Sequence, residues 1–179
     1  MMIRRAAPAD IEIILNICRQ ALEAPQWQPS AWAAYLAPAS EPPLLRAAFV
    51  AESATGIQGF AAATLLRDEG SGEYSRCELD SMAVSPGARQ QGMGSALFRA
   101  VLAWAAHEGA HHLGLEVRTG NLPALRMYER AGLRPEGRRP RYYADPDEDA
   151  LLLGMPVTPV PAPADFSTGN LVEGRPPRC

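Results

Sequence analysis

Apolar residues alternate with polar ones, or run together, in four short stretches in the first half of the chain. Each stretch is bounded by glycine, proline or polar residues, which is typical of β-strands. The expected strands cover residues 2–6, 44–51, 58–66 and 76–84. A turn at residues 53–56 separates the second strand from the third, so the sequence predicts a hairpin there.

The spacing changes to a helical period between the first two strands. Asp10 can cap or open a helix that reaches about Glu23, before Pro25 interrupts it. Ser30 is expected to cap a second, shorter helix that runs to Leu36. The apolar side of the first helix consists of Ile11, Ile14, Leu15, Ile17 and Cys18.

Strands and helices alternate in the second half. A helix at residues 95–108 has one apolar stripe and ends at Gly109. Asn121 is expected to cap a further helix, whose first turn tolerates Pro123 and which Gly132 terminates. The remaining strands are expected at residues 112–118, 133–138 and 149–155.

This order of elements predicts one α/β (α+β) domain over residues 1–156. Its core is expected to be a single mixed, mostly antiparallel central sheet with helices on both faces. Residues 157–179 differ, because they are rich in proline and poor in large apolar residues. They are expected to form an extended or disordered tail.

Composition narrows the class of protein. The chain has 179 residues and a net charge of -3, which gives no electrostatic support for binding nucleic acid. It contains no lysine, so no Schiff base or lysine nucleophile can form. Three scattered cysteines argue against a disulfide framework, and no apolar run is long enough for a membrane span. A cytoplasmic protein is the default expectation.

A glycine-containing turn carries the strongest chemical signal. The turn is Arg89-Gln90-Gln91-Gly92-Met93-Gly94, and it lies between an expected strand and an expected helix. Glycines let the backbone approach a ligand closely, and the following helix start offers unpaired N–H groups to an anion. The fingerprints of dinucleotide folds and P-loops are absent. The pyrophosphate of coenzyme A, or a tight turn without a ligand, remain as alternatives.

Two further residues combine with this turn. Glu116 is an acid inside an apolar strand, and a raised pKa there would suit a general base. The alternative is an ion pair with Arg118 or another arginine. Tyr128 lies among apolar residues on the expected helix after Asn121, where plain core packing is the alternative to a role in chemistry.

Together these segments resemble the GNAT superfamily of acetyl-CoA-dependent N-acetyltransferases. The resemblance rests on the turn at residues 89–94 and on the runs at residues 115–121 and 124–133. Within the superfamily, the bacterial enzymes that acetylate the N-terminal alanine of ribosomal protein S18 are the most similar. The likeness covers about residues 2–156.

The resemblance implies acetyl-CoA as co-substrate and a role for each matching residue. Glu116 would be the general base and would act through a water molecule, and Tyr128 would protonate the departing thiolate. The cofactor would contact Met82, Ala83 and Val84 through the pantetheine arm, and Arg89, Gln90, Gln91, Gly92, Met93, Gly94, Ser95 and Asn121 elsewhere.

The favoured acceptor is a protein N-terminal α-amine, on a ribosomal or another protein. Asp80 departs from the S18-type pattern, and it is either a second base or a contact for a different amine. Tyr142 lies in an arginine- and tyrosine-rich segment, residues 138–143, that is expected to be a substrate-facing hairpin loop. Two alternatives remain open: a small-molecule amine as acceptor, and a non-catalytic module that senses acyl-CoA. No metal site is expected, because the three histidines flank a helix end and a strand start.

Overall fold

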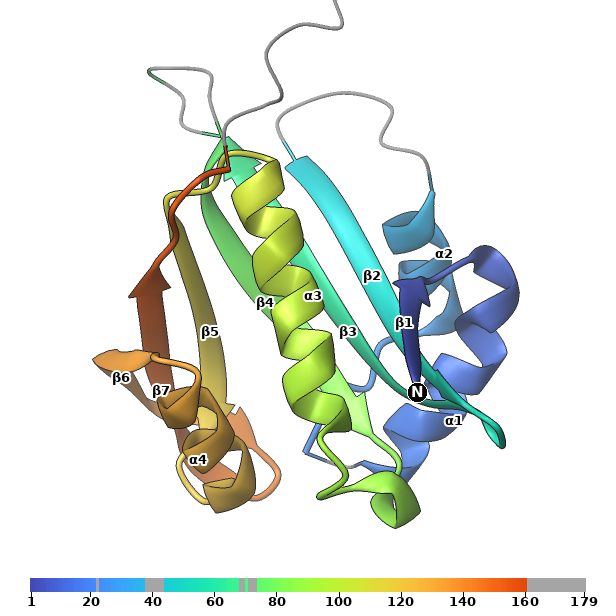
Figure 1. Cartoon of the computed structure of the whole chain (residues 1–179). Coiled ribbons are helices and arrows are strands. Elements are labelled where there is room, and N and C mark those ends of the chain that lie inside the picture. Colours follow the sequence, from blue (N-terminus) through green and yellow to red (C-terminus); the bar gives the residue numbers. More distant parts are fainter. Residues whose placement is uncertain (22, 38–43, 68–69, 71–73, 161–179) are drawn as a thin grey trace, which may run out of the picture.

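A mixed sheet with helices on both faces organises the chain, as predicted (Figure 1). The computed structural model describes residues 1–21, 23–37, 44–67, 70 and 74–160. Within these residues seven strands pair in the order β1-β2-β3-β4-β5-β7-β6. Only the β4–β5 pair is parallel, and the other five pairs are antiparallel. The strands are β1 (Met2–Arg5), β2 (Leu44–Ser53), β3 (Gly56–Arg67), β4 (Tyr74–Val84), β5 (His112–Arg118), β6 (Arg134–Ala144) and β7 (Asp147–Pro156).

The helices divide between the two faces of the sheet. Side chains alternate along β3, so that Phe60 and Ala62 pack with α1 (Ile11–Gln20) and α2 (Pro29–Leu36). Ala61, Ala63 and Leu65 face the other side and pack with α3 (Met93–His107) and α4 (Leu122–Arg130). Because three consecutive residues of this central strand are alanines, helices can approach it closely from both sides.

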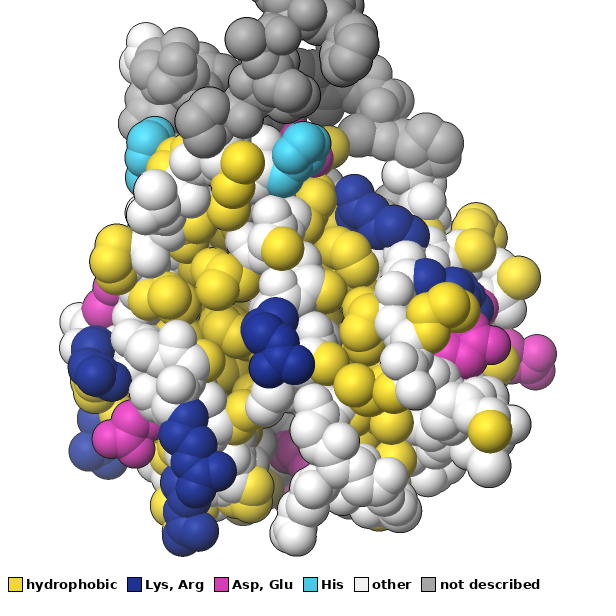
Figure 2. Space-filling model, in the orientation of Figure 1, with side chains coloured by type: hydrophobic (Ala, Val, Ile, Leu, Met, Phe, Trp, Pro, Cys, Tyr) yellow, Lys and Arg dark blue, Asp and Glu magenta, His cyan; other side chains and the backbone are white. Residues whose placement is uncertain are grey.

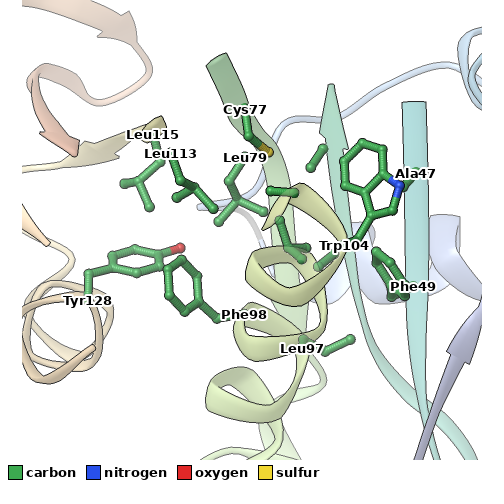
Figure 3. Packing of buried hydrophobic residues seen from close by; sticks show 14 of the residues in the cluster. Ala47, Phe49, Cys77, Leu79, Leu97, Phe98, Trp104, Leu113, Leu115 and Tyr128 are labelled. Carbon is green, nitrogen blue, oxygen red and sulfur yellow. The ribbon is translucent and has the colours of Figure 1, made fainter. Parts of the chain in front are cut away.

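The core on the α3 face is the larger of the two. Leu97, Phe98 and Trp104 of α3 pack against Phe49 of β2 and Leu79 of β4 (Figure 3). The other core is centred on Trp32 of α2, whose ring meets Phe60 edge to face at 5.2 Å. Its aromatic group also includes Trp27 and Tyr35, and this group lies beside the polar residues described below.

Helix boundaries differ from the sequence prediction at the N-terminal ends. Pro29 is the first residue of α2 and Gln28 is its N-cap, so Ser30 is not the cap, because proline's fixed φ suits the first helical position. The third helix begins at Met93, two residues before the predicted start. The first helix ends at Gln20 instead of about Glu23.

The prediction for residues 138–143 was wrong, because this segment is part of the edge strand β6 and not a loop. It pairs with β7 on one side only, and its polar residues gave no alternating apolar pattern to recognise. The register is irregular between Arg139 and Tyr143, where Arg141 has a positive φ of 49°. Tyr142 and Tyr143 are therefore held on a strand beside the hairpin turn.

The start of the predicted tail packs onto the domain. Val157 is buried, and its N–H donates to the carbonyl of His111 at 2.8 Å. The Val160 N–H donates to the carbonyl of Ala106 at 2.9 Å. The remaining residues of the predicted extended or disordered tail, 161–179, lie outside the described residues.

Asp10 ties the first strand to the start of α1. Its carboxylate accepts two hydrogen bonds from the Arg4 guanidinium, at 2.8 and 3.0 Å, and a third from the Ala7 N–H at 2.8 Å. It caps the short 3-10 turn Pro8–Asp10 in this way and makes no side-chain cap to α1. The hydrogen bonds from Arg4 are the main reason why the pKa of Asp10 lies below its usual value.

We expect Asp10→Asn to lower the free energy of unfolding by about 1–2 kcal/mol at pH 7, since it weakens charge-assisted hydrogen bonds. A carboxyl group with a depressed folded-state pKa stabilises the fold above its unfolded pKa of about 3.9. That contribution is lost as the pH falls through the folded-state pKa. Urea unfolding of both proteins at pH 7 and near pH 2.5 should therefore show the difference shrink at the lower pH. An undiminished difference would contradict this linkage.

Candidate functional site

The strands β4 and β5 separate halfway along their length (Figure 1). Their parallel pairing joins residues 76–79 of β4 to residues 112–115 of β5, and the register goes no further. The cause lies in the pairing of β4 with β3. Ala63 pairs with Leu79 and Ala62 with Ser81, so Asp80 is the extra residue of a β-bulge. Bulges bend a strand and increase its twist, which turns the second half of β4 away from β5.

The separation leaves one edge of β4 open from Asp80 to Val84. Within the described residues no strand pairs with this edge, although the other edge stays paired with β3 up to Val84. Met82 and Val84 pack towards the α3 face, and Ala83 is buried towards α1 and α2. Free backbone groups along an open strand edge can bind an extended ligand as an added strand.

The predicted turn lies at the far end of this open edge. Gln90 and Gly92 both have positive φ, at 62° and 79°, and Gly92 is the N-cap of α3. Within the described residues, the N–H groups of residues 90–95 donate no hydrogen bond. These N–H groups lie together at a helix start, and there is open space beside the α-carbon of Gly92. Such a group of free backbone donors suits a diphosphate.

Side chains around the turn hold its shape. The Arg89 guanidinium donates to the Val84 carbonyl at 3.1 Å and pairs with Glu23 at 2.5 Å. Gln91 donates from its side chain to the Gly87 carbonyl at 3.2 Å. A Cβ atom at Gly94 would lie 3.2 Å from the Met127 sulfur, so glycine lets α4 approach the start of α3.

Tyr128 reaches from α4 towards the separated strands. The centres of the Tyr128 and Phe98 rings lie 5.7 Å apart, in an edge-to-face contact. The Tyr128 oxygen points towards β5 and β4, where Leu113 and Leu79 lie (Figure 3). The residue is only 6% exposed, and burial raises the pKa of its phenol, with a smaller contribution from Tyr143. Within the described residues its hydroxyl makes no hydrogen bond, so the group is available to a ligand.

Local signals place α4, as predicted. The Asn121 side chain accepts from the Ala124 N–H at 3.3 Å, which caps the helix through its oxygen and leaves the amide nitrogen for other contacts. At the other end, the Leu133 N–H donates to the Tyr128 carbonyl, and Gly132 has a φ of 102°.

Glu116 lies on the opposite face of the sheet from Tyr128. Its neighbours Leu115 and Val117 belong to the α3-face core, so alternation directs Glu116 away from it. The side chain is 27% exposed, and Arg139 pairs with it at 3.1 Å. The predicted ion pair is thus made by an arginine from β6, whereas Arg118 pairs with Glu148 at 3.3 Å. Glu116 is therefore half-buried and not fully buried.

Tyr142 extends the group around Glu116. A hydrogen bond to the Glu116 carboxylate is the main cause that raises the pKa of Tyr142, and the Arg139 guanidinium lies 5.4 Å from the Tyr142 ring centre. The Tyr143 ring lies 5.1 Å from that of Tyr142 and 4.1 Å from the Arg118 guanidinium. The two tyrosines and two arginines form one wall beside β5.

Asp80 is the most strongly held acid at the separation of the strands. Its Oδ2 atom accepts from the Thr64 hydroxyl at 2.7 Å and from the Tyr35 hydroxyl at 2.9 Å. Burial is the main cause that raises the pKa of Asp80, and the two hydroxyls partly oppose this shift. Sequence reasoning missed both partners. Thr64 had a signal, as a polar residue within an apolar strand, whereas Tyr35 had none.

Glu148 braces the loop between β5 and α4. It accepts from the Gly120 N–H and from the Thr119 hydroxyl, the latter at 3.0 Å, and it pairs with Arg118. Arg118 also donates to the Asp145 carbonyl at 2.9 Å. These contacts fix the start of α4, and hence Tyr128, relative to the β6–β7 hairpin.

No helix among the described residues is long and apolar enough to span a membrane. The model of the acetyltransferase (GNAT) family matches residues 11–133.

Two curated relatives have different acceptors in their names. The ribosomal protein bS18-alanine N-acetyltransferase of Escherichia coli (strain K12) is 34% identical over 82 residues, which are 45% of this chain and 55% of that protein. The streptothricin acetyltransferase of Streptomyces lavendulae is 37% identical over 112 residues, which are 60% and 57% of the two chains. The matches thus span little more than half the length of these relatives.

Solved structures support the fold over more of the chain. The crystal structure of the ribosomal-protein-S18-alanine N-acetyltransferase from Escherichia coli has a TM-score of 0.71 and 24% identity, and covers 89% of this chain and 95% of that one. A GCN5-related N-acetyltransferase from Kribbella flavida has a TM-score of 0.72 and 25% identity, with 87% and 97% covered.

Proposed function

The chain belongs to the acetyltransferase (GNAT) family, and we propose that it transfers an acetyl group from acetyl-CoA directly to a primary amine. The observation that carries this proposal is the open edge of β4. It runs from Asp80 towards the turn at residues 89–94, near which the N–H groups of residues 90–95 donate no hydrogen bond among the described residues. An extended thioester fits along such an edge with its diphosphate at the turn. No covalent intermediate on the protein is needed, because both substrates can be present together.

The proposed cofactor contacts follow the open edge. The amides of Gln90, Gln91, Gly92, Met93, Gly94 and Ser95 hold the diphosphate, and Arg89 keeps their turn in shape. The backbone of Met82, Ala83 and Val84 binds the pantetheine arm. The free amide nitrogen of Asn121 is a further donor to the arm.

The reaction needs a proton donor near the leaving sulfur and a base near the attacking amine, and the candidates lie on opposite faces of the sheet. The amine nitrogen bonds to the thioester carbon, the carbon–sulfur bond breaks, and the sulfur gains negative charge. A thiol has a pKa of about 8.5 and a phenol about 10, so full proton transfer from Tyr128 to the thiolate is uphill. Tyr128 acts first as a hydrogen-bond donor to the sulfur. On the acceptor side the family resemblance favours Glu116 as the base, through water, with Asp80 as the other acid.

A protein N-terminal α-amine is the proposed acceptor. Such an amine has a pKa of about 8, so about a tenth is neutral at pH 7, whereas a lysine amine with a pKa of about 10.4 is almost wholly charged. The difference between these two pKa values corresponds to roughly 3.4 kcal/mol of deprotonation free energy. An α-amine therefore needs less help from a base, and a single carboxylate suffices for it. The S18-alanine acetyltransferase among the relatives supports this acceptor. The streptothricin acetyltransferase supports the alternative, a small-molecule amine.

An acetyl-transfer screen tests the proposal. Purified protein is given acetyl-CoA with peptides that begin with Ala, Ser or Met, or with a panel of free amines, and products are identified by mass. The same peptides with blocked N-termini are the controls. Transfer only to peptides with a free N-terminus supports the proposed acceptor. Transfer only to the free amines would show that the acceptor is a small-molecule amine instead. Tight acetyl-CoA binding without any transfer would indicate a sensor module and overturn the enzymatic proposal.

A further inference from the structure

An ion pair joins the turn at residues 89–94 to a distant part of the chain. The Arg89 guanidinium donates to Oε1 of Glu23 at 2.5 Å, and its Nε–H group donates to the Val84 carbonyl at 3.1 Å. Glu23 precedes Arg89 by 66 positions and lies between α1 and α2. One side chain thus holds together the end of the open edge of β4, the turn with the free amides, and the chain between α1 and α2.

Residues 23–28, called the link from here on, have a defined shape. The Gln26 side chain donates to two backbone carbonyls, at 2.8 and 2.9 Å, so it fastens the link to the end of α1. Ala24 is buried, and it belongs to the same core cluster as Ala83 of β4. The link therefore packs at the end of β4 that leads into the turn, and Figure 1 shows it there, in blue beside the lower end of β4.

The far end of the link approaches the place where β4 and β5 part. The Trp27 ring packs against the Tyr35 ring, with centres 5.3 Å apart, and the Tyr35 hydroxyl donates to Asp80 at 2.9 Å. The four residues of chain from Glu23 to Trp27 span at most about 14 Å. Over the four residues from Asp80 to Val84, β4 rises about 13 Å. The link is thus long enough to connect the two ends of the open edge.

The charge of Glu23 is unfavourable for the ligand proposed at this turn. A diphosphate brings negative charge to the free amides, and Arg89 is the only basic residue of the turn. Glu23 neutralises this arginine and adds a like charge near the anion. The two side chains are 42% and 37% exposed, and an exposed ion pair contributes little to the stability of a fold. Stability is therefore a weak reason for an acid at this position, and placement of the link is a stronger one.

We propose that Glu23 and Arg89 are positioning residues for the acceptor amine, because their ion pair holds the link, and with it Trp27, beside the reacting end of the open edge. This proposal rests on the proposed acetyl transfer and concerns the acceptor side alone. The half-buried Trp27 ring lines the approach of the residue that carries the amine. Coenzyme A does not need the ion pair, and the charge of Glu23 weakens its binding.

Replacing each partner with glutamine tests this assignment, because the effects on the two substrates differ. Glu23→Gln should raise KM for the best acceptor amine about tenfold, keep kcat within about threefold, and tighten coenzyme A binding about twofold to fivefold. Arg89→Gln should raise the same KM about tenfold but weaken coenzyme A binding. Glu12→Gln is the matched control. It removes an exposed acid of α1 that makes no ion pair among the described residues, and it should change neither constant.

Exchange of the two charges provides the rescue. The double variant Glu23→Arg/Arg89→Glu can form the ion pair in the reverse sense, so its acceptor KM should return to within about threefold of the wild type. Its coenzyme A affinity should fall below that of Arg89→Gln, because the turn then carries an acid. Calorimetry with coenzyme A and steady-state kinetics at saturating acetyl-CoA measure the two quantities separately. A damaged fold cannot restore KM while it weakens cofactor binding.

The assignment fails on any of three results. An acceptor KM that is unchanged in both glutamine variants would remove the positioning role. Additive increases of KM in Glu23→Gln/Arg89→Gln would show that the two residues act separately. Absence of transfer by the wild type to every amine would remove the proposed function and this acceptor role with it.

Fluorine NMR of protein labelled with fluorotryptophan reads the position of the link without turnover. The Trp27 signal, assigned with Trp27→Phe, should shift in both glutamine variants and return in the charge exchange. The signal of Trp104, which lies in the core on the α3 face, should stay in place. An unmoved Trp27 signal would show that the ion pair does not hold the link, whether or not the protein transfers acetyl groups.

Discussion

Replacing Tyr128 with phenylalanine should lower kcat about 100-fold and change the dissociation constant of acetyl-CoA by less than about threefold. A hydrogen bond to a group that becomes charged contributes about 1.5–3 kcal/mol, and general acid catalysis about 10²–10⁴-fold. Phenylalanine keeps the edge-to-face contact with Phe98, so the core loses only the oxygen. Burial raises the pKa of this phenol, which keeps it protonated over the pH range of an assay.

Turnover kinetics and calorimetry with coenzyme A separate the two effects. Loss of kcat with unchanged binding places the hydroxyl at the leaving sulfur. Phe98→Leu is a suitable control, because it disturbs the packing of the Tyr128 ring and leaves the hydroxyl in place. Equal turnover in Tyr128→Phe and the wild type would remove the acid role. A parallel loss of affinity would mean that the oxygen helps to bind the cofactor.

Local chemistry explains which parts of the site could be predicted from the sequence. Gln90 and Gly92 lie within a short turn, and the positive φ of Gly92 belongs to a residue type that adopts it readily. Asn121 and Gly132 bound α4 through contacts within a few residues. Such features depend on neighbours in the chain, so the glycine-containing turn and the two ends of α4 can be predicted from the sequence.

Contacts between distant segments could not be read in the same way. The Asp80 cluster joins α2, β3 and β4, and the residues Tyr35 and Asp80 are 45 positions apart. The bulge that separates β4 from β5 is a mismatch in register with β3, which no pattern within β4 reveals. The edge strand β6 is exposed along most of its length, so its sequence lacks the apolar alternation that identifies buried strands.

The pairing of Glu116 shows how one missed element changes the chemistry. Sequence alternation correctly placed an acid within an apolar strand, but the partner came from β6, which was expected to be a loop at that point. Once residues 138–143 form a strand, Arg139 lies beside Glu116 and Tyr142 reaches its carboxylate. Both partners of the Glu116 carboxylate thus come from a segment whose secondary structure was predicted wrongly.

Substitution of Ser95 by aspartate should weaken coenzyme A binding and leave the fold intact or slightly more stable. Ser95 is the third residue of α3, which has no acidic residue in its first turn. A carboxylate there stabilises the helix by about 0.3–1 kcal/mol through the dipole. The same charge repels a phosphate about 6–8 Å away by roughly 2–3 kcal/mol, at an effective dielectric constant of about 20. The expected loss of affinity is roughly 30- to 150-fold.

Ser95→Asn provides the matched control, because asparagine has the shape of aspartate without its charge. It should bind coenzyme A within about threefold of the wild type. Calorimetry with coenzyme A and thermal unfolding without ligand measure the two effects separately. Weaker coenzyme A binding together with unchanged or higher stability in Ser95→Asp cannot arise from a damaged fold. If Ser95→Asn shows neither effect, the charge is the cause, and an anion must bind at the start of α3. Equal affinity in all three proteins would show that the diphosphate binds elsewhere, and the open edge of β4 would lose the anchor that directs a thioester towards Asp80.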